Sequence, residues 1–196
     1  MKPKTARFLL TRIHGFTMMD ETMPPEPKLI MLGVPHSSIW DFVVAWLFAR
    51  AIGGKPRVMI KQEFFFWPLG ALLRSVGAIP VDRSNPIRIT KQIIDAMAQS
   101  ESFHLCIAPE GTRKPVKRWK TGFHTIARAT GVPVYLGYFD WGKRKSAMAR
   151  GSSVPTMPWP TCLPSRSSIR KRASFRNARA VWPTCNPPLQ SSRTTG

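Results

Sequence analysis

Acidic residues are missing from the last 56 positions of this 196-residue chain. Ordinary usage would place about seven there, yet residues 141–196 hold eleven Lys or Arg and no Asp or Glu. The first 140 residues carry 19 basic and 10 acidic groups. A segment with charges of both signs therefore precedes one whose charged residues are all basic. The net charge of +20 favours an anionic partner: a nucleic acid, an anionic membrane surface or a phosphorylated substrate.

Cysteines and long apolar runs are also scarce. The three cysteines, Cys106, Cys162 and Cys185, have neither metal-ligand spacing nor an even-numbered disulfide pattern, which favours a reducing compartment and predicts no metal site. No run approaches the roughly 18 apolar residues that span a bilayer, and the first ten residues lack the apolar region of a signal peptide. We therefore expect a cytoplasmic protein that meets a membrane only peripherally.

Apolar runs alternate with helical periods along the middle of the chain. The expected strands are Lys28–Val34, Arg57–Ile60, Gly77–Val81, Phe103–Ala108 and Pro133–Phe139. The expected helices are Ile39–Ala51, Pro86–Ser100 and Thr121–Thr130, with a short helix or turn over Phe64–Leu73. This order predicts an α/β fold with a largely parallel central sheet flanked by helices, in which ligands bind at the carboxyl ends of the strands.

Both ends of the chain differ from this α/β domain, which we place at residues 28–145. Residues 1–27 form a basic amphipathic segment, suited either to docking on the domain or to lying on lipid. Residues 146–196 are rich in Ser, Pro and Arg without a helical or strand period, which predicts a disordered basic tail. The abrupt loss of acidic residues suggests a frameshift, which sequencing of the codons for residues 139–150 would test.

The segment Pro35–Asp41 places a histidine and an aspartate five residues apart at a strand-to-helix junction. On one continuous helix, His36 and Asp41 would diverge by roughly 140°. They meet only if His36 lies in the turn and Asp41 in the first helical turn, with Ser38 as the cap. The carboxylate would then hold one imidazole nitrogen and leave the other to accept a proton. A capping box, in which Asp41 merely supports the start of the helix, explains the same residues.

Two further strand ends carry groups that suit a phosphorylated ligand. Glu110 follows one strand after a single proline and can accept hydrogen bonds from a polyol. Beside it, Gly111 permits close backbone approach, Thr112 offers a hydroxyl and Arg113 presents a guanidinium fork that matches phosphate. Arg83 follows another strand and adds a second cation at the same expected edge. Taken singly, each segment also fits an ordinary turn or a local salt bridge.

In combination and order, four segments resemble the ordered blocks of the lysophospholipid acyltransferase superfamily, which includes the glycerol-phosphate and 1-acylglycerol-phosphate acyltransferases. They are His36-x4-Asp41, Val81-Asp82-Arg83, Pro109-Glu110-Gly111-Thr112-Arg113 and Gly131-Val132-Pro133-Val134. The likeness spans about residues 29–140. It implies a glycerolphosphate acyltransferase-like domain, which the all-basic tail leaves incomplete.

The resemblance implies a role for each matching residue. His36 would be the general base that deprotonates the acceptor hydroxyl, with Asp41 orienting it. The residues that would hold the glycerol and phosphate of the acceptor are Arg83, Glu110, Gly111, Thr112, Arg113 and, in a supporting role, Lys120. Pro133 would lie on the acyl-donor side. The aromatic run Phe64–Trp67 fits either an apolar wall for an acyl chain or core packing.

The implied reaction uses a thioester, acyl-CoA or acyl-carrier protein, as co-substrate and needs no further cofactor. The acceptor would be a lysophospholipid or glycerol phosphate, and an anionic membrane surface would be a peripheral partner. No specific nucleic acid is expected. Three alternatives stay open: a basic nucleic-acid-binding protein whose tail interleaves Trp and Arg, a Ser hydrolase that uses His36 without a Gly-x-Ser-x-Gly elbow, and an inactive frameshifted homologue.

Overall fold

The computed structural model describes residues 1–20, 22–34, 38, 40–112 and 119–150 of the chain. The strands of this part are β1 (Thr17–Met18), β2 (Lys28–Val34), β3 (Pro56–Lys61), β4 (Ala78–Val81), β5 (Phe103–Ile107), β6 (Val134–Asp140) and β7 (Lys145–Arg150). Its helices are α1 (Pro3–Phe8), α2 (Trp40–Ala51), α3 (Leu69–Ser75), α4 (Pro86–Ala98) and α5 (Gly122–Thr130), with a π-helical turn η1 (Leu9–Ile13) and a 3-10 turn η2 (Gln62–Phe64). Each strand and helix predicted between residues 28 and 140 is present, and the predicted Phe64–Leu73 segment is divided between η2 and α3.

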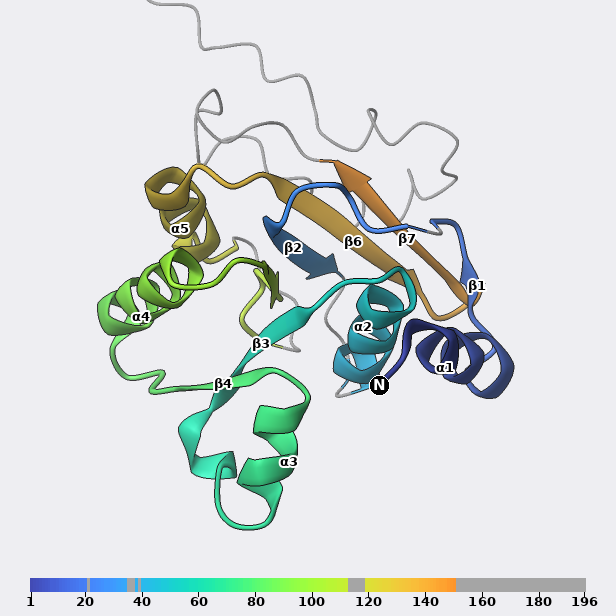
Figure 1. Cartoon of the computed structure of the whole chain (residues 1–196), viewed down its shortest axis with the longest axis horizontal. Helices are drawn as coiled ribbons and strands as arrows, with labels where there is room; N and C mark the ends of the chain where they lie inside the picture. Colours follow the sequence, from blue (N-terminus) through green and yellow to red (C-terminus); the bar gives the residue numbers. More distant parts are fainter. Residues whose placement is uncertain (21, 35–37, 39, 113–118, 151–196) are drawn as a thin grey trace, which may run out of the picture.

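The strands form one seven-stranded sheet in the order β1-β7-β6-β2-β5-β3-β4 (Figure 1). Every neighbouring pair is parallel except β6 with β7. The central strand β2 pairs with β6 on one side and with β5 on the other. The predicted α/β fold with a largely parallel sheet flanked by helices is therefore confirmed.

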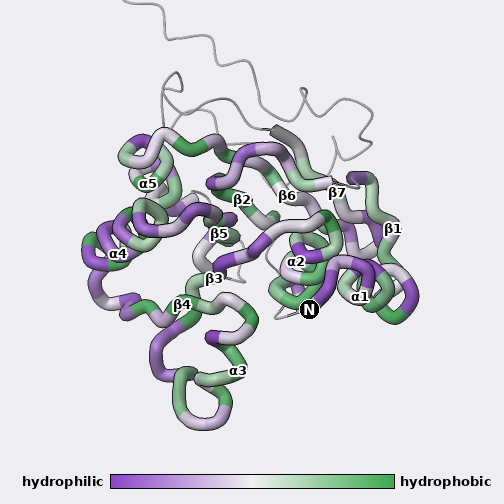
Figure 2. The backbone as a smooth tube through the Cα atoms, in the orientation of Figure 1, coloured by the Kyte–Doolittle hydropathy of each residue, from purple (hydrophilic) through white to green (hydrophobic). Residues whose placement is uncertain are grey.

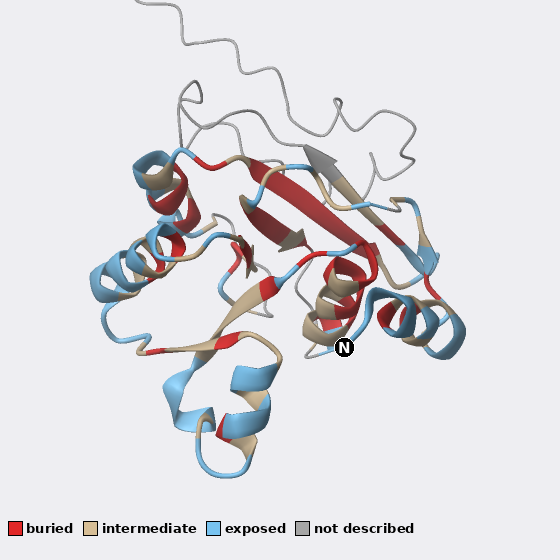
Figure 3. Ribbon diagram, viewed as in Figure 1, coloured by how far each residue is buried: buried red, intermediate tan, exposed pale blue. Residues whose placement is uncertain are grey.

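Helices cover both faces of the sheet, with α4 and α5 on one face and α1 and α2 on the other (Figure 1). In β2, Ile30, Leu32 and Val34 pack into the core beneath α4 and α5, whereas Leu29 and Met31 pack on the opposite face, toward α2. Figure 3 shows β2 and β6 largely buried. A strand buried on both faces has a continuous apolar sequence, which is why the limits of β2 were predicted to the residue.

The helices α4 and α5 have the predicted amphipathic pattern, visible as alternating hydrophilic and hydrophobic residues along α4 in Figure 2. Ile93 and Met97 are buried against the sheet, while Ile87 on the first turn is 83% exposed. Asn85 caps α4, because its side-chain oxygen accepts a hydrogen bond from the Arg88 N–H at 3.0 Å. Gly131 ends α5 in the left-handed conformation, with φ of 69°.

The sheet extends beyond the predicted strands at both ends of the chain. Residues 146–150, which we predicted to belong to the tail, form most of β7, which pairs antiparallel with β6. β1 comes from the N-terminal segment and pairs with β7. β1 is the edge strand, and β7 lies between β1 and β6. Neither strand has a marked apolar period, because backbone hydrogen bonds to a neighbouring strand do not require one. The prediction for residues 151–196 lies outside the described residues.

The N-terminal segment docks on the domain rather than extending away from it. Ala6, Leu10 and Phe16 are buried in a cluster with α2, whereas Phe8 and Ile13 are exposed. Docking is thus the arrangement seen for this segment, one of the two that its sequence allowed. In the described part of the chain, none of the helices has both the length and the apolar character needed to cross a membrane.

Candidate active site

The predicted site segments leave the sheet at one edge. β2, β5, β3, β4 and β6 all run in the same direction, so their carboxyl ends lie along that edge. The segments that carry Asp41 and Glu110 follow β2 and β5, which are direct neighbours. Arg83 follows β4, and β3 separates β4 from β5. Arg83 therefore leaves the sheet about 10 Å further along the edge than Glu110, given the ordinary spacing of strands.

Asp41 is the central carboxylate of the first segment. It lies in the first turn of α2 with only 5% of its surface exposed. Its Oδ2 accepts a hydrogen bond from the Ser38 N–H at 2.6 Å, and its Oδ1 accepts one from the Trp141 indole N–H at 2.7 Å. Ser38 Oγ in turn accepts from the Trp40 N–H at 3.2 Å. Asp41 and Ser38 thus form the reciprocal capping arrangement that the sequence allowed.

His36 lies outside the described residues, two positions after Val34 and two before Ser38. Its predicted contact with Asp41 stays a prediction. Capping by Asp41 leaves room for that contact, since an ionised carboxylate has about four acceptor sites on its two oxygens. The two interpretations of Asp41 are therefore compatible: the bonds that support the helix also fix the position of the carboxylate.

The second segment forms a tight turn at the end of β5. Glu110 is 3% exposed there, and the Gly111 N–H donates a hydrogen bond to the Ala108 carbonyl oxygen at 3.0 Å. Gly111 has a φ of 65°, and a Cβ added to it would lie 2.7 Å from Cε of Lys120. The Lys120 N–H donates to the Pro109 carbonyl oxygen at 2.8 Å. Both its backbone and its side chain thus bring Lys120 to the turn, and its supporting role in binding the acceptor stays a prediction.

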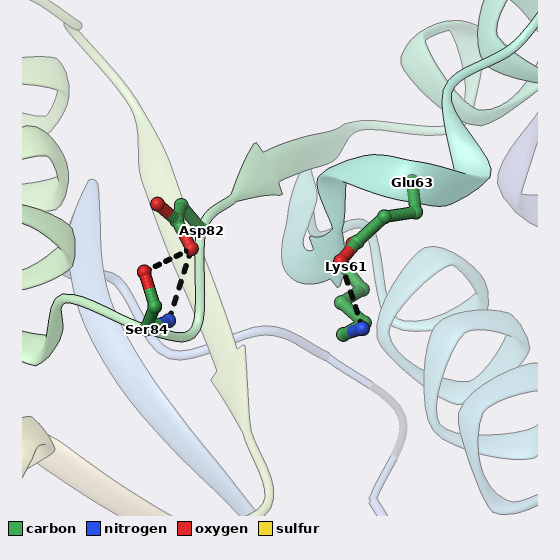
Figure 4. A network of polar contacts seen from close by, with 4 residues as sticks. All are labelled: Lys61, Glu63, Asp82 and Ser84. Carbon is green, nitrogen blue, oxygen red and sulfur yellow. Dashed lines mark hydrogen bonds and ion pairs between the residues drawn. The ribbon is translucent and has the colours of Figure 1, made fainter.

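Asp82 and Arg83 follow β4 in an exposed turn. The Asp82 Oδ1 accepts hydrogen bonds from the hydroxyl of Ser84 at 2.7 Å and from its N–H at 3.0 Å (Figure 4). These bonds to Ser84 lower the pKa of Asp82. Arg83 itself is exposed. The turn therefore holds the Asp82 carboxylate through Ser84 and leaves the Arg83 side chain at the surface, on the edge where the other segments meet.

The remaining predicted site residues are Thr112, Arg113 and Pro133, and they do not all lie at this edge of the sheet. Thr112 follows Gly111 and is half-buried, whereas Arg113 lies outside the described residues. Pro133 directly precedes β6, so it lies at the amino end of that strand, and its carbonyl oxygen accepts from the Ile30 N–H at 3.0 Å. That position is at the sheet edge opposite Asp41 and Glu110. The donor-side role of Pro133 stays a prediction.

Trp141 is a site residue that the sequence did not reveal. It follows the last residue of β6, and its indole N–H binds the buried carboxylate of Asp41 from a position 100 residues away in the chain. Its ring also packs edge-on against Phe16, with 5.2 Å between the ring centroids. The available signal was its place directly after a predicted strand of the parallel sheet, on the same edge as the other segments.

Together, these segments place two buried carboxyl groups at adjacent strand ends, with the Lys120 side chain beside Gly111 in the second segment. Such an edge can accept hydrogen bonds from ligand hydroxyls and attract an anionic group. Within the described residues, no three His, Cys, Asp or Glu side chains gather as they would around a metal ion. The chemistry that the edge suits is binding of a hydroxylated, anionic molecule.

One comparison with known proteins identifies a family, and another identifies a similar fold. A protein-family model described as acyltransferase matches residues 16–136. The fold is similar to the crystal structure of the 1-acyl-sn-glycerophosphate (LPA) acyltransferase PlsC from Thermotoga maritima, with a TM-score of 0.52 and 17% sequence identity. That similarity covers 91% of this chain and 80% of the other. At this identity it shows the fold alone. A search of curated protein sequences finds no match.

Proposed function

The chain belongs to the acyltransferase family, and on that premise we propose that it transfers a fatty acyl group to the hydroxyl of a lysoglycerophospholipid such as 1-acylglycerol 3-phosphate. The donor is a thioester, either acyl-CoA or acyl-carrier protein. The observation that carries this proposal is the pair of buried carboxyl groups, Asp41 and Glu110, at the carboxyl ends of adjacent parallel strands. A relative of the same fold is named for the same acceptor.

His36 acts as the general base in the proposed reaction. It takes the proton from the acceptor hydroxyl as the oxygen attacks the thioester carbonyl carbon, and a new ester C–O bond forms. The C–S bond then breaks, and the thiolate leaves with the proton that His36 returns. No acyl-enzyme forms in this sequence, so no nucleophilic side chain is required. General base catalysis of this kind contributes roughly 10²–10⁴-fold to the rate.

Asp41 prepares His36 for this role. The hydrogen bonds from Ser38 and Trp141 hold the carboxylate in one orientation at the start of α2. A carboxylate held in this way fixes the tautomer of the imidazole and stabilises the imidazolium that forms during proton transfer. The hydrogen bonds to Asp41 thus contribute to catalysis by limiting its movement.

The acceptor is held by the segment after β5. Glu110 accepts a hydrogen bond from the glycerol hydroxyls, and the phosphate lies by Gly111 and Thr112, near the Lys120 ammonium. Arg113 supplies a bidentate contact to the same phosphate. Arg83, further along the edge, adds a longer-range attraction for the anionic headgroup. Pro133 has a supporting place on the donor side, and peripheral attachment to an anionic membrane brings the lipid acceptor to the site.

Thioester consumption tests the mechanism. Purified full-length chain is mixed with acyl-CoA or acyl-carrier protein thioester and a panel of lysolipids, beside the variants His36→Ala and His104→Asn. His104 lies at the amino end of β5, at the opposite sheet edge, so His104→Asn is the matched control. We expect His36→Ala to lose at least about 100-fold in rate and the control to keep it.

Three outcomes would contradict the proposal. Equal rates for wild type and His36→Ala would remove His36 as the base. Release of free fatty acid without a lysolipid requirement would indicate a hydrolase. An inactive wild type that melts cooperatively would support the alternative that the chain is an inactive homologue.

A further inference from the structure

The connection between β3 and β4 forms the most exposed apolar surface of the described chain. Residues 62–75, here called the aromatic tip, comprise η2, α3 and the loop between them, and they project from the body of the molecule (Figures 1 and 3). Four large apolar side chains of the tip are exposed. They are Phe64 at 52%, Phe66 at 59%, Trp67 at 87% and Leu72 at 61%.

This exposure excludes core packing for most of the aromatic run. Of the ten large apolar side chains that are exposed in the described residues, four lie within nine consecutive positions of the tip. Single exposed apolar residues are ordinary, but a cluster of them marks an interaction surface. Phe65 is the exception, because the Arg74 guanidinium covers its ring at 5.2 Å from the centroid.

Backbone contacts hold the tip in one conformation. The Gly70 N–H donates to the Phe66 carbonyl oxygen at 2.6 Å, and the Phe65 N–H donates to the Gln62 carbonyl oxygen at 2.9 Å. Gly70 is required for this fold, since an added Cβ would lie 2.5 Å from the Phe65 carbonyl oxygen. The exposed rings are therefore presented by an ordered segment, and binding through them needs little further ordering.

The charges around the tip are those of a surface that binds anionic lipid. Lys61 and Arg74 lie directly before and within the tip, and Arg83 follows β4 at the same edge of the sheet. The acidic residues of these segments are Glu63 and Asp82. The Glu63 carboxylate forms an ion pair with the Lys61 ammonium at 2.8 Å, and the Asp82 carboxylate accepts a hydrogen bond from the Ser84 hydroxyl (Figure 4). Exposed Trp and Phe with cations beside them are the combination that favours the interface between headgroups and acyl chains. Figure 2 shows the hydrophobic residues that run along α3.

The tip also leaves the sheet at the edge that carries the candidate site. Phe64 follows Lys61, the last residue of β3, by three positions, and β3 is the neighbour of β5, which leads to Glu110. We propose that the aromatic tip inserts into the interfacial region of an anionic phospholipid bilayer, so that the carboxyl edge of the sheet faces the lipid. This inference rests on the proposed function in one respect, the choice of a membrane lipid as acceptor.

Binding to vesicles tests the insertion without any substrate. The full-length protein is sedimented with vesicles of phosphatidylcholine and phosphatidylglycerol in about 0.5 M salt, which screens the attraction of the basic tail. The test variant is Phe66→Ser with Trp67→Ser. The matched control is Phe8→Ser with Ile13→Ser, which removes two exposed apolar side chains, at 58% and 65%, from the N-terminal segment.

We expect the test variant to bind vesicles at least roughly tenfold more weakly than wild type, since two large apolar side chains no longer enter the interface. The control variant keeps the wild-type affinity. Equal affinity of wild type and test variant would overturn the proposal, as would loss of binding in the control alone. A wild-type dimer that the test variant abolishes, with vesicle affinity unchanged, would assign the tip to self-association. If the double variant loses its melting transition, the single variant Trp67→Ser decides.

An activity measurement separates this inference from the proposed function. The test variant should transfer acyl groups normally to a short-chain lysolipid dissolved as monomers and poorly to a lysolipid embedded in vesicles. Equal loss with both acceptors would contradict a docking role for the tip. If no variant and no wild type shows transfer, the proposed function fails while the vesicle measurement still decides the role of the tip.

Discussion

At the scale of single residues, the site depends on how a buried carboxylate is held. Asp41 is 5% exposed, and burial of a charged group is unfavourable unless hydrogen bonds replace its water. Ser38 supplies one such bond from within the same turn, and Trp141 supplies another from the far end of the domain. The second bond links the end of β6 to the start of α2.

Removal of this second bond should reduce both catalysis and stability. Trp141→Phe keeps a ring against Phe16 but removes the N–H, so we expect kcat to fall about tenfold with little change in KM, and the free energy of unfolding to fall by about 1.5–3 kcal/mol. Trp46→Phe removes an indole N–H that donates to the Val76 carbonyl oxygen at 2.7 Å. This control should lose stability without losing kcat. Equal kcat values for both variants would contradict the role of Trp141.

A second prediction at this scale concerns pH. Burial lowers the pKa of His104 from its ordinary value of 6.5, and Nδ1 of His104 accepts from the Lys55 N–H at 3.0 Å. The unfolded chain therefore binds a proton near pH 6.5 that the folded chain binds only at lower pH. The contribution of His104 to stability is complete above pH 6.5. It is lost as the pH falls toward the pKa that His104 has in the folded state.

Urea unfolding measures this effect. Wild type should be less stable at about pH 5 than at about pH 7.5. His104→Asn keeps an acceptor for the Lys55 N–H but does not titrate, so the fall in stability should be smaller in this variant. The same pH dependence in both proteins would assign the effect to other groups, among them His124, whose pKa is also lowered by burial.

At the scale of elements, the turn between α3 and β4 depends on one glycine. Gly77 has a φ of 89°, and a Cβ there would overlap the Pro56 carbonyl oxygen. We expect Gly77→Ala to lower the free energy of unfolding by about 2 kcal/mol or more, because strain and overlap add. Gly122 begins α5 with open space where a Cβ would lie, so Gly122→Ala should be neutral or slightly stabilising. Thermal melts of the two variants compare them, and equal melting temperatures would contradict this account.

At the scale of the whole molecule, β7 is the last strand in the described part of the chain. The strand pairs with β6, which would otherwise be an unpaired edge strand of the sheet. Seven of the 30 basic residues follow it, in residues 151–196. The described domain and these seven basic residues can therefore be separated by truncation.

Two truncations test this division. A chain that ends at Arg150 should melt cooperatively at the full-length temperature, transfer acyl groups as well as the full chain, and bind nucleic acid more weakly, with a smaller salt dependence. A chain that ends at Arg144 lacks β7 and should melt lower and aggregate. Calorimetry and light scattering measure both. Equal stability of the two truncations would show that β7 contributes nothing to the fold.

The sequence by itself determined the central sheet and its order of elements. Apolar runs such as Lys28–Val34 identify strands buried on both faces, and Asn85 and Gly131 mark helix ends through local hydrogen bonding and backbone conformation. It also predicted that the segments with Asp41 and Glu110 meet at one edge, because the strands before them are parallel. All of these features depend on contacts between residues close in the chain or on burial that each residue type reflects.

Only the tertiary structure decided the contact of Trp141 with Asp41, the pairing of β1 and β7, and the exposure of the aromatic tip. Each depends on where distant segments lie in space. An indole at the end of one strand gives no local sign of the carboxylate that it will reach. An edge strand needs only the backbone of its partner, which leaves little trace in its side chains. An aromatic run has the same sequence whether a core covers it or solvent surrounds it, because its burial depends on the elements packed around it.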